Sequence, residues 1–211
     1  MFLNLVLPGS KAWKPYWVEI KGCWLDISLE YGKEPFTSFH IGVLKVRPSK
    51  EYPDRPNVLE FYDGDGFTTV HFYVFTYDPF DILDFFKSIC NAYKKWREDV
   101  TTSHTPASNV TCEVKPPGLF SSPLIWTVFP EKISYKKPGK EENNQTPLSD
   151  IGTITPSANP SHVAYFKFSS KQNQDPQEQK CSNLEQMKSL LNAVYTNLFL
   201  NSNPPSPPAE N

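Results

Sequence analysis

The segment GSKAWKPYWVEIKGCWLDISLEYGKE, residues 9–34, holds the residues that decide the fold. Within it, YWVEI and CWLDIS are short runs of aromatic and β-branched residues, the composition typical of β-strands. Three tryptophans and two tyrosines fall in this one stretch. The pattern therefore predicts two neighbouring strands that carry an unusual amount of aromatic surface.

Alternation along the first of these strands assigns its side chains to two faces. Successive side chains of a strand point to opposite sides of the sheet, so Tyr16, Val18 and Ile20 share one face and Trp17 and Glu19 the other. Aromatic residues occur on both faces. We expect some to pack in the core and others to line a loop or a partner surface.

More strand-like runs lie on either side of this segment. In the first half they are FLNLVL, FHIGVLKV, VLEFYD and TVHFYVFTY, and in the second half LIWTVF, KISYKK, DIGTITP and HVAYFKFSS. DGDG, residues 63–66, is a strong hairpin signal between two of them. The polar stretches RPSKEYPDRPN, PGKEENNQTPLSD and KQNQDPQEQKCS are predicted to be loops.

Two segments have the pattern of amphipathic helices. In the first, Asp78 is a good N-cap and Pro79 suits the first helical position; in the second, Ser182 and Glu185 form a capping box. The residues expected on the buried face are Ile82, Phe85, Phe86, Ile89, Tyr93 and Trp96 in the first helix, and Leu184, Met187, Leu191, Val194 and Leu198 in the second.

The order of these elements indicates one plan used twice: a run of antiparallel strands followed by a single closing helix. We therefore expect a mostly β protein with two similar units. The predicted division is a first domain at 1–100, a linker at 101–111, a more divergent second domain at 112–202 and a disordered, proline-rich tail at 203–211.

The charge distribution argues against nucleic acid as a partner. Residues 1–100 hold 12 Lys and Arg against 14 Asp and Glu, and residues 101–211 hold 9 against 9. A surface that binds a duplex usually needs a clustered basic excess. No segment approaches the roughly 20 consecutive apolar residues of a membrane helix, and the four widely spaced cysteines are typical of reduced thiols in a cytosolic protein.

Catalytic and metal-binding patterns are missing from the sequence. Asp63 and Asp65 resemble the start of a calcium loop, but the position that needs a glutamate is Val74. The histidines lie near no recognised nucleophile motif, and neither GxGxxG nor GxxxxGK[ST] occurs. We therefore expect no enzyme activity, no metal and no cofactor.

The strand, basic loop and second strand of LVLPGSKAWKPYWVEIKGCWLDIS, with Trp13, Lys14 and Trp17 in a W-K-x-x-W pattern, resemble the opening of a pleckstrin-homology (PH) domain. The resemblance covers residues 1–98, and in residues 112–201 it rests on element order and the last helix. It implies two PH-like units in tandem, each an antiparallel, strongly bent sheet or barrel of about seven strands capped by one C-terminal amphipathic helix.

A PH domain that binds inositol phosphates uses a lysine near the end of strand one and an arginine just inside strand two, and the matching positions here are Leu7 and Tyr16. The basic residues left as candidate contacts to a phosphoinositide or another anionic partner are Lys11, Lys14, Lys21, Lys45 and Arg47. A second basic cluster, in KISYKKPGK, comprises Lys132, Lys136, Lys137 and Lys140.

Two functions remain open. The first is a protein-interaction module: an adaptor that receives a partner on its sheet edges, its aromatic patches or the junction of its domains. The second is recruitment to a phosphoinositide-containing membrane through the basic loop lysines. The expected location is the cytoplasm, with peripheral membrane attachment under the second function.

Overall fold

The computed structural model describes residues 1–7, 10–55, 57–63, 70–118, 121–141, 144–159 and 161–203. Most of the predicted DGDG turn and the predicted tail after Asn203 lie outside these ranges. The chain forms two compact units: Met1–Trp96 with Pro156–Ala164 is unit 1, and Arg97–Thr155 with Tyr165–Asn211 is unit 2.

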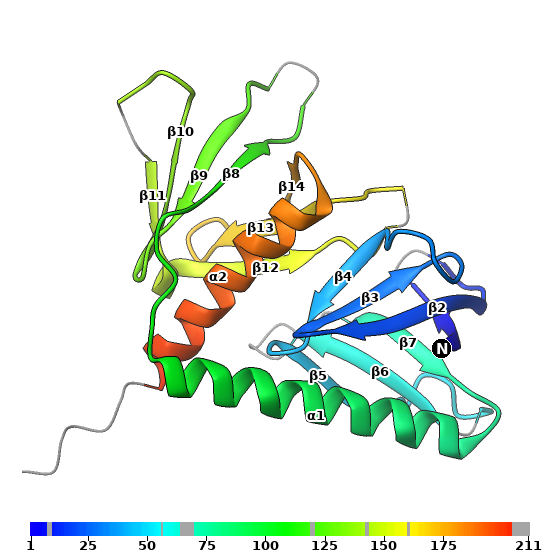
Figure 1. Ribbon diagram of the computed structural model, residues 1–211. Coiled ribbons are helices and arrows are strands. Elements are labelled where there is room, and N and C mark those ends of the chain that lie inside the picture. Colours follow the sequence, from blue (N-terminus) through cyan, green and yellow to red (C-terminus); the bar gives the residue numbers. More distant parts are fainter. Residues whose placement is uncertain are drawn as a thin grey trace, which may run out of the picture. The chain divides into compact units, whose positions relative to one another are not determined.

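Unit 1 contains a seven-stranded antiparallel sheet (Figure 1). Its strands are β1 (Phe2–Val6), β2 (Lys14–Lys21), β3 (Trp24–Ser28), β4 (Thr37–His40), β5 (Leu44–Pro48), β6 (Val58–Asp63) and β7 (Val70–Phe75). They lie in the order β4-β3-β2-β1-β7-β6-β5, so β1 is the central strand.

The alternation in β2 is confirmed by burial. Tyr16 and Val18 belong to the hydrophobic core of unit 1, and Ile20 packs against it. Trp17, on the other face, instead contacts Phe2 and Tyr31 at the surface, with ring centroids 5.2 and 4.6 Å away. The aromatic residues of this strand thus divide between core and surface.

A single helix, α1 (Pro79–Ser103), follows β7. The Asp78 side chain accepts a hydrogen bond from the Phe80 amide at 2.8 Å, which confirms Asp78 as the cap. Figure 1 shows the helix running beside β5, β6 and β7. The predicted buried face was too wide: four of its members, Ile82, Phe85, Ile89 and Trp96, are buried, but Phe86 and Tyr93 are each 37% exposed because they lie on the flank of the helix.

Residues from the second half of the sequence complete unit 1. The segment Pro156–Ala164 belongs to this unit, and Ala158 joins its hydrophobic core. The hydroxyl of Thr37, at the start of β4, donates a buried 2.7 Å hydrogen bond to the carbonyl of Ser157. Unit 1 is therefore assembled from two separate stretches of chain.

Unit 2 repeats the plan of unit 1 with a second seven-stranded antiparallel sheet. Its strands are β8 (Val110–Lys115), β9 (Leu124–Val128), β10 (Lys132–Lys136), β11 (Asn144–Pro147), β12 (Ile151–Pro156), β13 (Tyr165–Ser170) and β14 (Gln177–Cys181), and a short 3-10 helix, η1 (Leu148–Asp150), precedes β12. The order β11-β10-β9-β8-β14-β13-β12 is that of unit 1, position for position.

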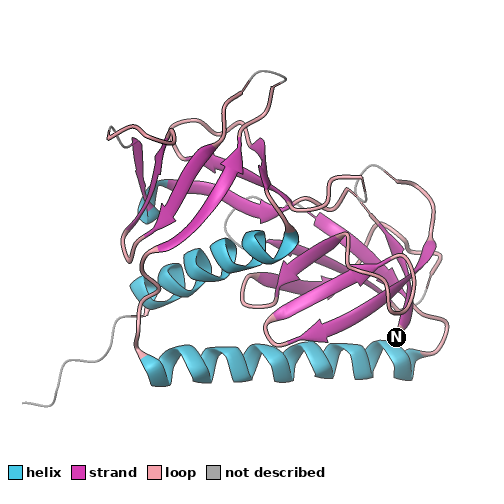
Figure 2. Ribbon diagram, turned by 45° about the horizontal axis from the view of Figure 1, so that its top comes forward, coloured by secondary structure: helices cyan, strands magenta, loops and turns pink. Residues whose placement is uncertain are grey.

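The closing helix of unit 2, α2 (Leu184–Ser202), packs on β8, β9, β13 and β14, and Figure 2 shows both helices. The predicted capping box is wrong by one residue. Asn183 is the N-cap, and its side chain accepts a 2.9 Å hydrogen bond from the Gln186 amide. Asparagine takes this role as readily as serine.

Two predicted loops turn out to contain strands. β11 lies within PGKEENNQTPLSD and β14 within KQNQDPQEQKCS. Both have polar sequences without strict alternation, and their place in the sheet comes from pairing with β10 and with β13 and β8. The predicted fold class, two similar units of about seven antiparallel strands each closed by a helix, is confirmed. Neither helix in the described ranges is long and apolar enough to cross a bilayer.

Candidate functional site

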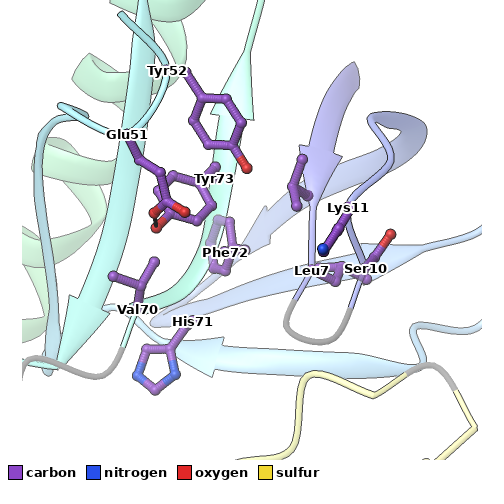
Figure 3. A pocket seen from close by; sticks show the side chains of 10 residues that line it. Leu7, Ser10, Lys11, Glu51, Tyr52, Val70, His71, Phe72 and Tyr73 are labelled. Carbon is purple, nitrogen blue, oxygen red and sulfur yellow. Dashed lines mark hydrogen bonds between the residues drawn. The ribbon is translucent and has the colours of Figure 1, made fainter.

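A cavity of about 420 Å³ opens beside the loop that joins β1 to β2 in unit 1. Figure 3 shows Leu7, Ser10 and Lys11 on one side and Glu51, Tyr52 and Tyr73 on the other. The remaining lining residues are Val6, Val70, His71 and Phe72. The walls thus come from β1, the segment between β1 and β2, β7, and the loop between β5 and β6, which folds over the outer face of β7.

A tyrosine and a glutamate form the polar wall of the cavity. The Tyr73 hydroxyl donates a short hydrogen bond to Glu51. Burial, followed by this hydrogen bond, raises the pKa of Tyr73 well above its ordinary value. Burial also raises the pKa of Tyr52, and the nearby Glu51 carboxylate adds to the effect. Both hydroxyls are therefore protonated at neutral pH, and since Tyr73 donates its single hydrogen to Glu51, Tyr52 is the one of the two that can donate to a ligand.

Next to the cavity lies a group of aromatic side chains that we call the aromatic ledge: Trp13, Tyr52, Tyr73, Phe75 and Tyr77. Its rings pack edge to face. Trp13 lies 5.1 Å from Tyr52 and 5.6 Å from Phe75, Tyr52 lies 5.1 Å from Tyr73, and Phe75 lies 4.8 Å from Tyr77, all between ring centroids. Such contacts fix ring orientations.

The side chains of the ledge differ in their exposure to solvent. Phe75 is 4% exposed and forms the floor, Tyr77 is 83% exposed, and Trp13, Tyr52 and Tyr73 are half-buried. The Arg55 guanidinium lies 5.5 Å from the Trp13 ring and 5.2 Å from the Phe75 ring. This places a permanently charged hydrogen-bond donor against the rings.

The ledge lies over the centre of its sheet rather than at an edge. β1 pairs with β2 and β7, and β7 pairs with β1 and β6. Their ladder N–H and C=O groups bond to neighbouring strands, so a ligand on the ledge contacts side chains and cannot extend the sheet.

The order of the strands and the closing helix, repeated in both halves, decides the architecture. Both units have a PH-like fold. No family model matches the chain, and no curated protein matches it. Among solved structures, one match is the N-terminal PH domain of human ARAP2, which is 16% identical, has a TM-score of 0.36 and covers 51% of this chain and 95% of that chain.

In PH-like unit 1, one of the predicted basic residues lies at the cavity. Lys11 lines the cavity, and Lys14 begins β2 opposite Leu5. Both are exposed. Lys21 lies at the other end of β2, where it forms a 3.1 Å ion pair with Glu19. The strand between them separates Lys14 from Lys21 by roughly 20 Å.

The other two predicted residues of unit 1 lie on β5, an edge strand. Lys45 is paired in register with Tyr62. Arg47 forms an ion pair with Glu60, whose side chain is 8% exposed, and its guanidinium lies 4.5 Å from the Tyr62 ring centroid. Lys11 is therefore the predicted basic residue that lines the cavity, and Arg47 lies in a separate contact with Glu60 and Tyr62.

The two substituted clamp positions of the PH-like pattern are both buried. Leu7 is 3% exposed and Tyr16 is 7% exposed, and both belong to the core. Burial also raises the pKa of Tyr16. Neither position presents a charge to a ligand.

The predicted basic cluster of unit 2 divides along β10. Lys132, at the start of the strand, donates to the Gln145 side chain at 3.0 Å and lies 5.9 Å from the Phe129 ring centroid. Lys136 ends the strand, and Lys137 and Lys140 lie in the turn that follows it. These three are exposed at one tip of unit 2.

Sequence reasoning missed three of the site residues, Glu51, Tyr52 and Tyr73. Glu51 and Tyr52 belong to a stretch whose sequence indicates only a proline-rich loop. Tyr73 belongs to a predicted strand with no feature that marks a binding site. The available signal was an aromatic residue among prolines in RPSKEYPDRPN. In the described ranges, no group of three or more His, Cys, Asp or Glu residues is placed to hold a metal ion.

Proposed function

We propose that this chain is a non-catalytic PH-like interaction module, an adaptor whose unit 1 binds a segment of a protein partner on the aromatic ledge and the adjoining cavity. The observation that carries the proposal is the ledge itself. It combines half-buried rings that fix one another's orientation, the Arg55 guanidinium against two of these rings, and a cavity lined by the Tyr52 hydroxyl donor. Tyrosine, tryptophan and arginine are the side chains that contribute most binding energy at protein interfaces.

The positions of the basic residues favour a protein over a lipid. Of the predicted basic residues in unit 1, Lys11 lines the cavity and Lys14 is exposed at the start of β2, while Lys21 and Arg47 are already in ion pairs. At about 1 kcal/mol for each basic residue near an anionic surface, two lysines provide weak membrane attachment. The buried Leu7 and Tyr16 replace the two charges that would strengthen it.

An affinity capture with matched variants tests the proposal. The full chain, Tyr52→Ala and Tyr31→Ala, an exposed tyrosine that contacts Trp17 outside the ledge, are each immobilised and exposed to native lysate. We expect a defined set of proteins that Tyr52→Ala loses and that Tyr31→Ala retains. Capture of nothing, or of the same proteins by Tyr52→Ala and the unaltered chain, would contradict the proposal.

Phosphoinositide-directed recruitment to a membrane surface is a second candidate, favoured by two exposed lysines, Lys11 at the cavity and Lys14 at the start of β2. The exposed tip of unit 2, with Lys136, Lys137 and Lys140, would add to it if both units faced one surface. Under this candidate, Lys21, Lys45 and Arg47 contribute to the same anionic contact.

Vesicle sedimentation separates the two candidates. Phosphatidylcholine vesicles with and without a phosphoinositide are mixed with the unaltered chain and with the Lys11→Glu plus Lys14→Glu variant. Binding that requires the phosphoinositide and is lost in the variant supports recruitment. Equally weak binding in all four mixtures excludes it and leaves the adaptor.

A further inference from the structure

The kind of ligand that the aromatic ledge can bind depends on the hydrogen bonding of the strands beneath it. The inference rests on the proposed function and names the kind of peptide segment that the ledge binds. The ledge covers β1 and β7, which are paired on both sides. A peptide laid across it meets no ladder N–H or C=O groups, and burying its own backbone N–H groups against aromatic carbon would leave them without acceptors.

Proline removes that cost because it has no backbone N–H. A run of prolines also adopts the polyproline II conformation without a partner, so little chain entropy is lost on binding. Its pyrrolidine rings are compact and apolar and pack on aromatic faces. Its carbonyl oxygens accept hydrogen bonds, and donors lie at the ledge in the Arg55 guanidinium and the Tyr52 hydroxyl.

We infer that the aromatic ledge of unit 1 binds a proline-rich segment in the polyproline II conformation. Tyr52 contacts Trp13 and Tyr73 with ring centroids 5.1 Å apart in each case, so the three rings form one continuous aromatic surface, and Tyr52 and Tyr73 also line the adjoining cavity. Polyproline segments are recognised by aromatic-lined sites. The chain itself carries a sequence of this class, PPSPP at residues 204–208.

Two exposed tyrosines provide a matched pair of variants. Tyr77, on the ledge, is 83% exposed, and Tyr31, which contacts Trp17 in a different aromatic group, is 72% exposed. Removing either ring takes little buried surface from the fold. Tyr52→Ala is the third variant, and its ring lies between Trp13 and Tyr73.

The experiment is a fluorescence anisotropy titration of a labelled polyproline peptide of about ten residues, with a glycine–serine peptide of equal length as control. The protein is the full chain in which Pro204, Pro205, Pro207 and Pro208 are replaced by alanine, so that its own segment does not compete. We expect saturable binding of polyproline only, weakened at least about fivefold by Tyr52→Ala and by Tyr77→Ala. Tyr31→Ala should leave the affinity unchanged.

Three results would overturn the inference: no saturable binding of polyproline, equal binding of the glycine–serine peptide, or equal affinities for Tyr77→Ala and Tyr31→Ala. The capture experiment distinguishes this failure from failure of the proposed function. If polyproline does not bind but Tyr52-dependent capture persists, only the ligand class is wrong. If Tyr52-dependent capture is also absent, both are wrong.

Discussion

Gly42 lies directly against the indole ring of Trp96. A Cβ atom added to Gly42 would lie 2.6 Å from Cζ3 and 2.7 Å from Cη2 of that ring, and 2.9 Å from Cε1 of His40. The ring has little room to move, because Trp96 is 7% exposed and packs edge to face on His40 with centroids 5.0 Å apart. Glycine at position 42 is thus what allows α1 to approach the turn after β4.

Gly42→Ala should destabilise the protein by about 1–3 kcal/mol, the usual effect of overpacking a core. Urea denaturation of the full chain, followed by circular dichroism, measures the change. In a Trp96→Leu background the same substitution should cost clearly less, because the two closest contacts are gone and only the contact with His40 Cε1 remains. Equal effects of Gly42→Ala in both backgrounds would show that the indole is not the cause.

Thr37→Val should release the segment Pro156–Ala164 from unit 1. The substitution preserves the shape of the side chain but removes the hydroxyl that bonds to the Ser157 carbonyl, leaving that buried acceptor without this donor. We expect faster hydrogen–deuterium exchange in residues 157–164 while exchange in β2 and β3 stays unchanged. Thr111→Val, at an exposed threonine whose hydroxyl contacts Thr127, is the matched control and should change neither region.

Much of the fold could be predicted because most strands and both helices have periodic sequences. The alternation at residues 16–20 correctly identified the buried face of β2, and the cap at Asp78 identified the start of α1. β14 could not be found in this way because QEQKC lacks apolar alternation, although Gln179 and Cys181 are buried. Its place depends on pairing with the preceding strand, β13, and with β8, which is far away in the sequence.

The site was predicted only in part, for a related physical reason. Lys11 was identified from its basic loop, and it lines the cavity. Glu51 and Tyr52 reach Tyr73 only because the loop after β5 folds over the outer face of β7. No periodicity encodes that path. The contribution of residues 156–164 to unit 1 was missed for the same reason, since nothing local in the sequence marks them as part of the first core.

Asn197→Ala should destabilise unit 2 by roughly 2–4 kcal/mol, because it removes three hydrogen bonds and leaves buried backbone groups unpaired. The Asn197 side chain is fully buried in α2. It donates to the carbonyls of Ala107 and Phe129 at 2.8 and 3.0 Å, and accepts from the Ala107 amide at 2.8 Å. It therefore ties α2 both to the segment before β8 and to the end of β9.

Asn201→Ala is the matched control for this prediction. Asn201 lies one turn later in α2 and donates a single exposed hydrogen bond to the Pro130 carbonyl at 3.0 Å. Its loss should cost less than about 1 kcal/mol. Thermal unfolding of the two variants under identical conditions makes the comparison, and similar melting temperatures would show that the buried network contributes little.

Alkaline pH should destabilise the protein through Tyr73. Burial, and then the hydrogen bond to Glu51, raise the pKa of Tyr73 in the folded state above its ordinary value of 10.0. A raised pKa in the folded state means that protonation of Tyr73 favours folding. The contribution of Tyr73 to the free energy of unfolding is complete below pH 10, where the tyrosine is protonated in both the folded and the unfolded chain. This contribution is lost as the pH rises above 10, because there the unfolded chain releases the proton while the folded chain retains it. The free energy of unfolding should therefore fall with rising pH above about pH 10.

Urea midpoints measured at intervals from about pH 8 to 11 test this dependence. Tyr73→Phe should give a shallower decline, since it removes the titrating hydroxyl, and a lower midpoint at pH 8, since it removes the hydrogen bond to Glu51. Glu51→Gln retains a neutral acceptor but removes the charge that helps to raise the pKa of Tyr73, so its decline should lie between the other two. Parallel declines for Tyr73→Phe and the unaltered chain would assign the alkaline sensitivity to other groups, of which Tyr16, whose pKa burial also raises, is the first to examine.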